Sequence, residues 1–267
     1  MPGPDYTIFA FTDLSMCTSL TDGDRSFLEP FARGSRLLSK PNDEATGSRD
    51  EDTSMRNASN KGDAQKEVQD IDPSYGFDEF LASMDILICG RGLYEQTMQR
   101  TNGKWPYTGK RLIVFSAVPL SEPVSSPDGQ PPQRPFTPPP NSEHFTGTPA
   151  QLMQKLFRDN TRSRKFRRES VWVMGGASIR GALLQLGAIE RIELVVVPKI
   201  ITRGNPFAPR SGSVGVPLWA FPSIEGGQEE ERADVDLQLI ECRSYENGVL
   251  GLSYVVGGMS YVVGGNP

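Results

Sequence analysis

The segment from Val171 to Ile200, VWVMGGASIRGALLQLGAIERIELVVVPKI, limits the possible folds of this chain more than any other stretch. An apolar run is broken by Gly175–Gly176, a helical pattern follows, and a second apolar run closes the segment. Apolar runs of strand length on either side of a helical pattern are typical of a β-α-β unit. The segment therefore predicts a strand at Val171–Met174, a helix from about Ser178, and a second strand.

Further strands and helices alternate along the rest of the chain. Strands are predicted at Asp5–Phe11, Asp85–Gly90 and Arg111–Ser116, helices at Phe77–Met84, Arg91–Arg100 and Pro149–Asp159, and partial helix at Asp24–Leu38. Two closing strands, VDLQLIECRSY and GVLGLSYVV, are joined through Asn247–Gly248, which is a strong hairpin signal. This alternation predicts an α/β domain with a mainly parallel sheet and a C-terminal antiparallel hairpin.

Three polar stretches interrupt the alternation, at about residues 40–73, 119–149 and 208–233. The first is densely charged and poor in apolar residues, and the second is rich in proline. Such compositions are typical of loosely held loops and extended spacers. We therefore expect one domain over residues 1–267, with these stretches as insertions.

The composition excludes several classes of function. The formal net charge is −5, whereas non-specific nucleic-acid binding needs a basic surface. The one histidine, His144, and three widely spaced cysteines predict neither a metal site nor a histidine-based triad. No stretch approaches the roughly 20 apolar residues of a membrane span, and the N-terminus has no basic region. We expect a cytoplasmic protein with a small-molecule ligand.

Small and polar residues follow three of the predicted strands. Gly175, Gly176, Ala177 and Ser178 follow one strand, Gly90–Arg91 another, and Ser116 a third. The carboxyl ends of parallel strands meet at one sheet edge, glycine permits close approach, and helix N-termini favour anions. These residues predict a site for phosphate-bearing groups. The alternative for the glycine pair alone is a tight turn without a ligand.

The order of these segments resembles the C-terminal reductase domain of the riboflavin-pathway RibD proteins, in the dihydrofolate-reductase-like superfamily. The segments are DILICGR, GKRLIVFS, VWVMGGASIRGALLQLGAIERIELVVVPKIITRGNPF and VLGLSYVV. The resemblance implies a three-layer α/β/α fold and an NADPH site in which Gly175–Ser178 face the pyrophosphate. It places Gly90, Arg91 and Ser116 near the adenosine half. Relatives commonly dimerise, which favours a homodimer.

The chain departs from the family pattern at several positions. The Ser-Leu-Asp-Gly type segment is replaced by FTDLSMCTSLTDGD, where Asp13 and Asp22 are both candidates for the catalytic acid. Leu93 replaces a hydroxyl residue, and Ala117 stands where relatives often carry a basic residue. Two functions are therefore kept open. One is an NADPH-dependent reductase of a small heterocyclic or carbonyl substrate, in riboflavin-like or secondary metabolism. The other is a repurposed cyclase, isomerase or binding protein without a redox step.

Overall fold

The computed structural model describes residues 3–14, 16–19, 26–39, 71–120, 122, 136–162, 167–200, 216–219 and 234–257. Its helices are α1 (Phe77–Ser83), α2 (Arg91–Arg100), α3 (Pro149–Arg162), α4 (Ala177–Gln185) and the 3-10 helix η1 (Ser26–Phe31). The strands in the first half are β1 (Asp5–Thr12), β2 (Cys17–Ser19), β3 (Ser35–Ser39), β4 (Ile71–Asp72), β5 (Ile86–Gly90) and β6 (Arg111–Phe115). They are followed by β7 (Ser142–Phe145), β8 (Ser170–Gly175), β9 (Ile189–Val196), β10 (Val216–Pro217), β11 (Leu237–Tyr245) and β12 (Leu250–Val256).

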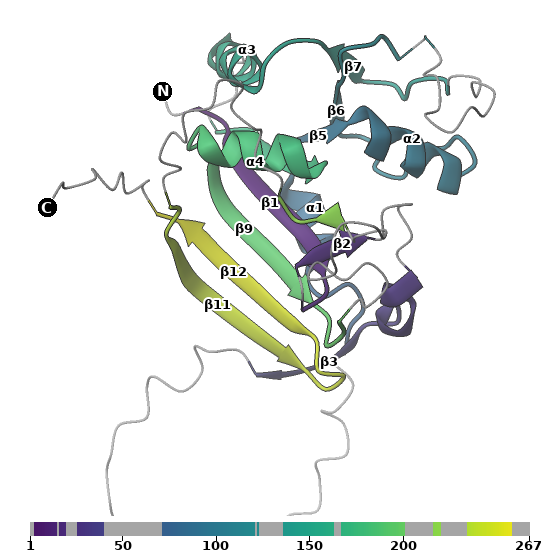
Figure 1. Cartoon of the computed structure of the whole chain (residues 1–267), viewed down its shortest axis with the longest axis vertical. Coiled ribbons are helices and arrows are strands. Elements are labelled where there is room, and N and C mark those ends of the chain that lie inside the picture. The colour runs from purple at the N-terminus through teal and green to yellow at the C-terminus, as the bar shows by residue number, and fades with distance from the viewer. Residues whose placement is uncertain are drawn as a thin grey trace, which may run out of the picture.

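One large sheet organises the described residues, with strand order β4-β3-β11-β12-β9-β1-β8-β5-β6-β7 (Figure 1). The pairings from β9 across to β7 are parallel. The pairings from β9 to β12 and on to β11, β3 and β4 are antiparallel. The predicted mixed, mainly parallel sheet with a C-terminal hairpin is confirmed.

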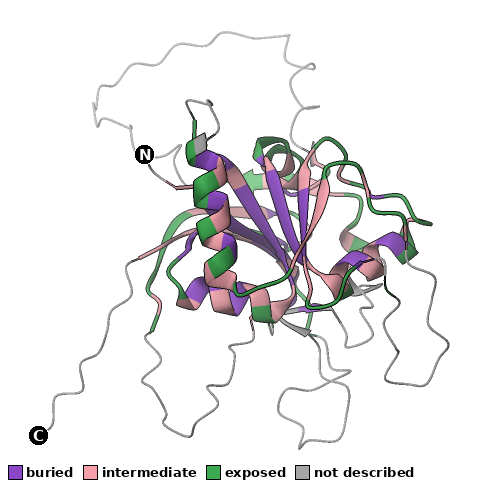
Figure 2. Ribbon diagram, turned by 90° about the horizontal axis from the view of Figure 1, so that it is seen from above, coloured by how far each residue is buried: buried purple, intermediate pink, exposed green. Residues whose placement is uncertain are grey.

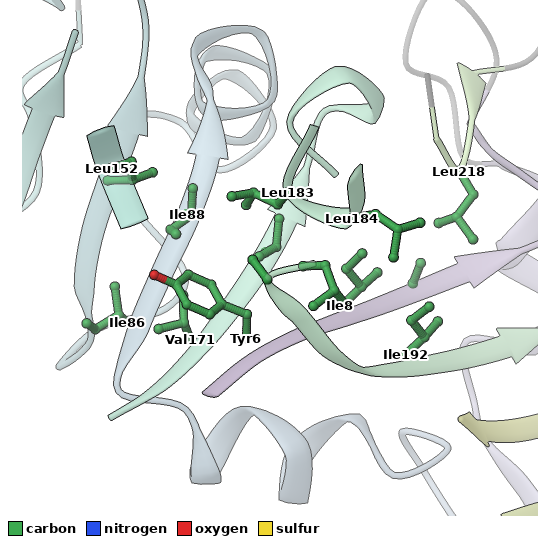
Figure 3. Close-up of a cluster of buried hydrophobic side chains, with 14 of the residues drawn as sticks. Tyr6, Ile8, Ile86, Ile88, Leu152, Val171, Leu183, Leu184, Ile192 and Leu218 are labelled. Atoms are coloured by element: carbon green, nitrogen blue, oxygen red, sulfur yellow. The ribbon is translucent and has the colours of Figure 1, made fainter. Parts of the chain in front are cut away.

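Helices cover both faces of the parallel half, which makes three layers. On one face, α3 and α4 pack on a core that includes Leu152, Leu183 and Ile88 (Figure 3). On the other face, α1 and α2 pack on a second core that contains Tyr94 and Leu87. A parallel sheet covered on both faces needs apolar residues along its whole strands, which is what the apolar runs of the sequence supply. Figure 2 shows these central strands buried between the helices.

The edge strand β7 was not predicted, because it lies in the proline-rich stretch at 119–149. It pairs in parallel with β6. An ion-pair network also holds it in place. Arg111 of β6 lies 2.8 Å from Glu143 of β7 and 2.7 Å from Asp159 of α3. Lys155 contacts the same two carboxylates. Short strands also occur in the other two predicted insertions, as β4 and β10.

The predicted partial helix at Asp24–Leu38 is only half right. A 3-10 helix ends at Phe31 and the strand β3 begins at Ser35. Pro30 lies inside the short helix and disfavours its continuation as α-helix. Gly34 then turns the chain at φ +71°, where a Cβ would lie 2.3 Å from the Asp72 carbonyl oxygen.

Among the described helices, none is both long and apolar enough to cross a membrane.

Two leucines of the α4 region provide a matched test of this packing. Leu183 is fully buried, whereas Leu186 is 46% exposed. We expect Leu183→Ala to lower the unfolding free energy by about 2–5 kcal/mol, because it leaves a cavity in the core. Leu186→Ala should change it by no more than about 0.5 kcal/mol. Urea denaturation followed by circular dichroism measures both, and equal effects would contradict the described core.

Candidate functional site

Two helix N-termini converge where β5 and β8 end side by side. Gly90 is the N-cap of α2 and Gly176 is the N-cap of α4, and neither helix is capped by a side chain. A Cβ built on Gly90 would lie 3.6 Å from the backbone nitrogen of Gly176, so the two ends almost touch. Ala177 and Ser178 form the first turn of α4. Backbone N–H groups and helix dipoles here favour an anion.

Gly175 and Gly176 differ in backbone conformation and in the space available for a side chain. Gly175 has φ +142°, and a Cβ there would lie 2.6 Å from Nη2 of Arg180. Gly176 has φ −73°, which any residue adopts, and a Cβ there would meet nothing within 4 Å. The peptide bond between them is cis. The fold itself therefore requires glycine at 175, whereas at 176 a side chain would fill open space beside the helix N-termini.

The predicted residue Arg91 lies at the start of α2, but its guanidinium contacts the loop after β6. Its Nε lies 2.7 Å from Oε1 of Glu95, and its Nη1 donates to the carbonyl oxygen of Pro119 at 2.8 Å. It also donates to the carbonyls of Val118 and Glu122. These contacts make Arg91 a clamp for this loop, which follows the strand next to β5.

Ser116 directly follows β6, and its hydroxyl is bonded within its own turn. The Oγ atom donates to the carbonyl oxygen of Val118 at 2.7 Å and accepts from the Val118 N–H at 3.1 Å. Its carbonyl oxygen lies 2.8 Å from Nε2 of His144. Ser116 thus lies at the predicted sheet edge, with its side chain already used in shaping the loop.

The two predicted catalytic acids differ in what the structure shows of them. Asp13 directly follows β1, the strand next to β8, and is fully buried. Its carbonyl oxygen accepts from the N–H of Met16 at 3.1 Å. Asp22 lies outside the described residues. One acid candidate therefore lies at the same sheet edge as the glycines.

An aromatic cavity of about 150 Å³ opens beside this edge, between the sheet and helices α1 and α2. It is lined by Phe9, Ala10, Phe11, Thr18, Phe77, Leu93, Thr97, Tyr107, Trp172, Met174 and Arg180. The indole of Trp172 is fixed by a 3.3 Å hydrogen bond from its Nε1 to the carbonyl oxygen of Phe9. Sequence reasoning missed this cavity, since the strands and loops that form its walls are far apart in the chain.

Arg180 is a second residue that sequence reasoning missed. It is only 3% exposed, although it carries a charge. Its Nη1 donates to the carbonyl oxygen of Leu218 at 2.8 Å, and its Nη2 donates to that of Met174 at 3.3 Å. The available signal was an arginine among the apolar residues of ASIRGALLQ, four residues after Gly176. Charged residues on the buried face of a helix are rare enough to mark a site.

A larger groove of about 820 Å³ lies beside α1 and crosses the sheet from β8 and β1 to β11. Charged residues line it, including Asp5, Arg191, Glu193 and Arg243. Burial raises the pKa of Glu193, and a hydrogen bond from Ser253 acts in the opposite direction. Neither the groove nor the smaller cavity is lined by a predicted site residue, but Met174, which lines the smaller cavity, directly precedes Gly175, so the smaller cavity is the candidate site.

Comparisons with known proteins bear on the fold. No family model and no curated protein matches the sequence. A Shewanella sp. PV-4 protein assigned to riboflavin biosynthesis is similar in structure, with TM-score 0.53 and 13% identity. The match covers 95% of this chain and 99% of that one. At this identity the likeness shows the fold alone. The chain therefore has the α/β fold expected from the resemblance to the riboflavin-pathway reductases.

Two other solved structures match at TM-scores below 0.5. A pyrimidine reductase-like protein of Corynebacterium diphtheriae matches with TM-score 0.45 and 16% identity, over 95% of this chain and 92% of its own. The diaminohydroxyphosphoribosylaminopyrimidine deaminase/5-amino-6-(5-phosphoribosylamino)uracil reductase of Thermotoga maritima matches with TM-score 0.48 and 11% identity. That match covers 95% of this chain and 56% of the Thermotoga protein, so the chain spans little more than half its length.

The glycine pair gives a direct test of the site geometry. We expect Gly175→Ala to lower the unfolding free energy by about 1–3 kcal/mol, because its Cβ would strain the backbone and collide with Arg180. Gly176→Ala should leave it within about 0.5 kcal/mol of the wild type. Thermal or urea unfolding of the two variants makes the comparison. If Gly176→Ala were the more damaging change, the described geometry would be wrong.

Proposed function

We propose that this chain is an NADPH-dependent reductase of a small heterocyclic or carbonyl substrate. The observation that carries the proposal is the pair of uncapped helix N-termini at Gly90 and Gly176, directly beside an aromatic cavity. The open space in front of Gly176 supports it further. The proposed enzyme is one domain over residues 1–267, which agrees with one sheet that contains strands from both ends of the chain.

The residues present fit the pyrophosphate of a dinucleotide. The backbone at Gly176, Ala177 and Ser178 forms the N-terminus of α4, where N–H groups can donate to phosphate oxygens. The second N-terminus, at Gly90, adds its dipole from the neighbouring strand. Because Gly176 has no side chain, a phosphate can approach this backbone closely.

The aromatic cavity would hold the substrate ring close to this cradle. Met174 links the two regions, since it lines the cavity and directly precedes the glycine pair. A bound nicotinamide cofactor would supply the hydride, which is chemistry that the side chains of the chain do not provide themselves. The protein's own task is to orient the two rings and to exclude water from between them. The cavity's apolar walls suit both tasks.

Asp13 is the proposed proton donor. It follows β1 at the same sheet edge and is fully buried. A carboxyl group at this sheet edge can serve as a general acid for a ring bound there. Asp22 remains the second candidate from the sequence.

The preference for NADPH over NADH is inferred from the resemblance to the riboflavin-pathway reductases. Residues 116–120, Ser-Ala-Val-Pro-Leu, contain no basic side chain for a 2′-phosphate. Arg91 is near this loop, but it donates to the loop backbone. The test of cofactor binding must therefore include both dinucleotides.

We expect wild-type protein to bind NADPH with a low-micromolar Kd in a calorimetric titration. Gly176→Asp should weaken binding by at least about 10-fold, since its carboxylate would occupy the phosphate position and repel it. The unfolding midpoint of this variant should stay close to that of the wild type, because the Cβ points into open space. Gly176→Ala separates the effect of bulk from that of charge.

Position 176 is the right place for this test, and position 175 is not. Any side chain at 175 would strain the backbone and displace Arg180, so weaker binding there would have two explanations. No binding of NADPH or NADH at millimolar concentration would sink the reductase proposal. The alternative function, a repurposed cyclase, isomerase or binding protein without a redox step, would then be favoured.

A further inference from the structure

The loop after β6 lies on the other side of the glycines from the aromatic cavity. The strand order at this edge is β1-β8-β5-β6, and the residues of this sheet that line the cavity come from β1 and β8. Gly90 of β5 pairs with Phe115 of β6, so the loop that begins at Ser116 lies next to the N-terminus of α2. The two helix N-termini therefore lie between the cavity and this loop.

A dinucleotide consists of two halves joined by a pyrophosphate. With the pyrophosphate at the helix N-termini and the nicotinamide half directed to the aromatic cavity, the adenosine half extends over the ends of β5 and β6. The loop after β6 is the surface that this half would meet, and Ala117 and Val118 are exposed on it. The conformation of this loop would then decide how well the adenosine half fits.

Arg91 holds this loop from the first turn of α2. A guanidinium has five N–H groups, and four hydrogen bonds of Arg91 are described. The acceptors are Oε1 of Glu95 at 2.7 Å and the carbonyl oxygens of Val118 at 3.2 Å, Pro119 at 2.8 Å and Glu122. The side chain of Arg91 is only 10% exposed, and the carboxylate of Glu95 balances its charge. A phosphate would have to displace these acceptors in order to bind the guanidinium.

Other contacts fix the start of the same loop. The hydroxyl of Ser116 exchanges two hydrogen bonds with the backbone of Val118, at 2.7 Å and 3.1 Å. The carbonyl oxygen of Ser116 accepts from Nε2 of His144 at 2.8 Å and from the hydroxyl of Thr146 at 3.1 Å. The loop is thus shaped by contacts within the protein before a ligand arrives, which lowers the ordering cost of binding.

We propose that Arg91 is a positioning residue for the cofactor, which acts through the loop after β6 and not through contact with a phosphate. It fixes the backbone at Val118 and Pro119, and this backbone forms the wall for the adenosine half. As a statement about the cofactor, the inference rests on the proposed reductase function. As a statement about the loop, it rests on the described hydrogen bonds of Arg91.

The first test compares a whole dinucleotide with one of its halves. We expect Arg91→Gln to weaken NADPH binding to the full chain roughly 10-fold in a calorimetric titration, because the adenosine half loses its wall. Reduced nicotinamide mononucleotide, measured by its competition with NADPH, should keep its affinity, since it lacks that half. A merely structural role for Arg91 would not separate these two ligands.

Two further variants serve as controls of this comparison. Arg167→Gln removes a 62%-exposed arginine that pairs with Asp85, at the opposite end of β5, and should change neither affinity. Ser116→Ala loosens the same loop without altering Arg91, and should weaken NADPH binding by about 3-fold. The second variant tests the role of the loop even if Arg91→Gln does not fold.

The salt dependence of binding separates positioning from direct contact with a phosphate. The double variant Arg91→Gln/Glu95→Gln removes one positive and one negative charge, so the net charge of the chain stays the same. We expect its loss of NADPH affinity relative to the wild type to be equal at low and high salt. A lost contact between Arg91 and a phosphate would instead give a larger loss at low salt, where charge interactions are less screened.

Hydrogen exchange tests the loop without any cofactor. In Arg91→Gln, the amides of Ala117, Val118 and Leu120 should exchange faster than in the wild type, because the carbonyl oxygens at 118 and 119 lose their donor. The amides of β6, at residues 112–114, should keep their exchange rates, since they are bonded within the sheet.

Four results would overturn the inference. They are unchanged NADPH affinity in Arg91→Gln, an equal loss for the mononucleotide, a loss that shrinks as salt is added, and unchanged exchange in the loop. Any of them, with NADPH bound by the wild type, would leave the reductase proposal standing and remove only this role of Arg91. No dinucleotide binding by the wild type would remove both proposals.

Discussion

The parallel pairing of β8 with β1 on one side and β5 on the other is the constraint on which the site depends. Three parallel strands side by side deliver their carboxyl ends to one edge, and two of them lead directly into helices. In the proposed site the backbone itself would form the phosphate-binding surface, because the residues at those turns are Gly90 and Gly175–Gly176. The helices α3 and α4 pack on one face of these strands, and α1 and α2 pack on the other.

The two arginines of the site illustrate how place decides the role of a charge. Arg91 was expected to bind a phosphate-bearing ligand, yet its guanidinium donates to carbonyl oxygens of the loop after β6. Arg180 looks like an ordinary helical residue in the sequence, yet it is buried at the junction of the cavity and the glycines. The local pattern gave no means of telling the direction in which either side chain points.

The central strands and most helices could be predicted from the sequence, because a doubly covered parallel sheet leaves unbroken apolar runs such as ILICG in β5. The glycines at the carboxyl ends of β5 and β8 could also be placed at one edge, because the carboxyl ends of parallel strands meet there. The edge strand β7 could not be found, since SEHF has no such run and is held by ion pairs to Arg111 and Lys155. The cavity could not be predicted from the sequence for another reason. Its walls, from Phe9 to Tyr107 and Trp172, meet only through the tertiary fold.

The hydrogen bond from Arg180 to the carbonyl of Leu218 has a consequence for the stretch at 208–233. That stretch reads as one long insertion, but Leu218 within it is almost fully buried, and β10 beside it pairs with β2. Residues 216–219 therefore attach an interior point of this stretch to the rest of the fold. Leu218 supports the pocket, because its carbonyl oxygen holds the guanidinium of Arg180 at the cavity wall. A substitution at these four residues would thus be expected to reach the pocket, although the sequence around them predicts only an insertion.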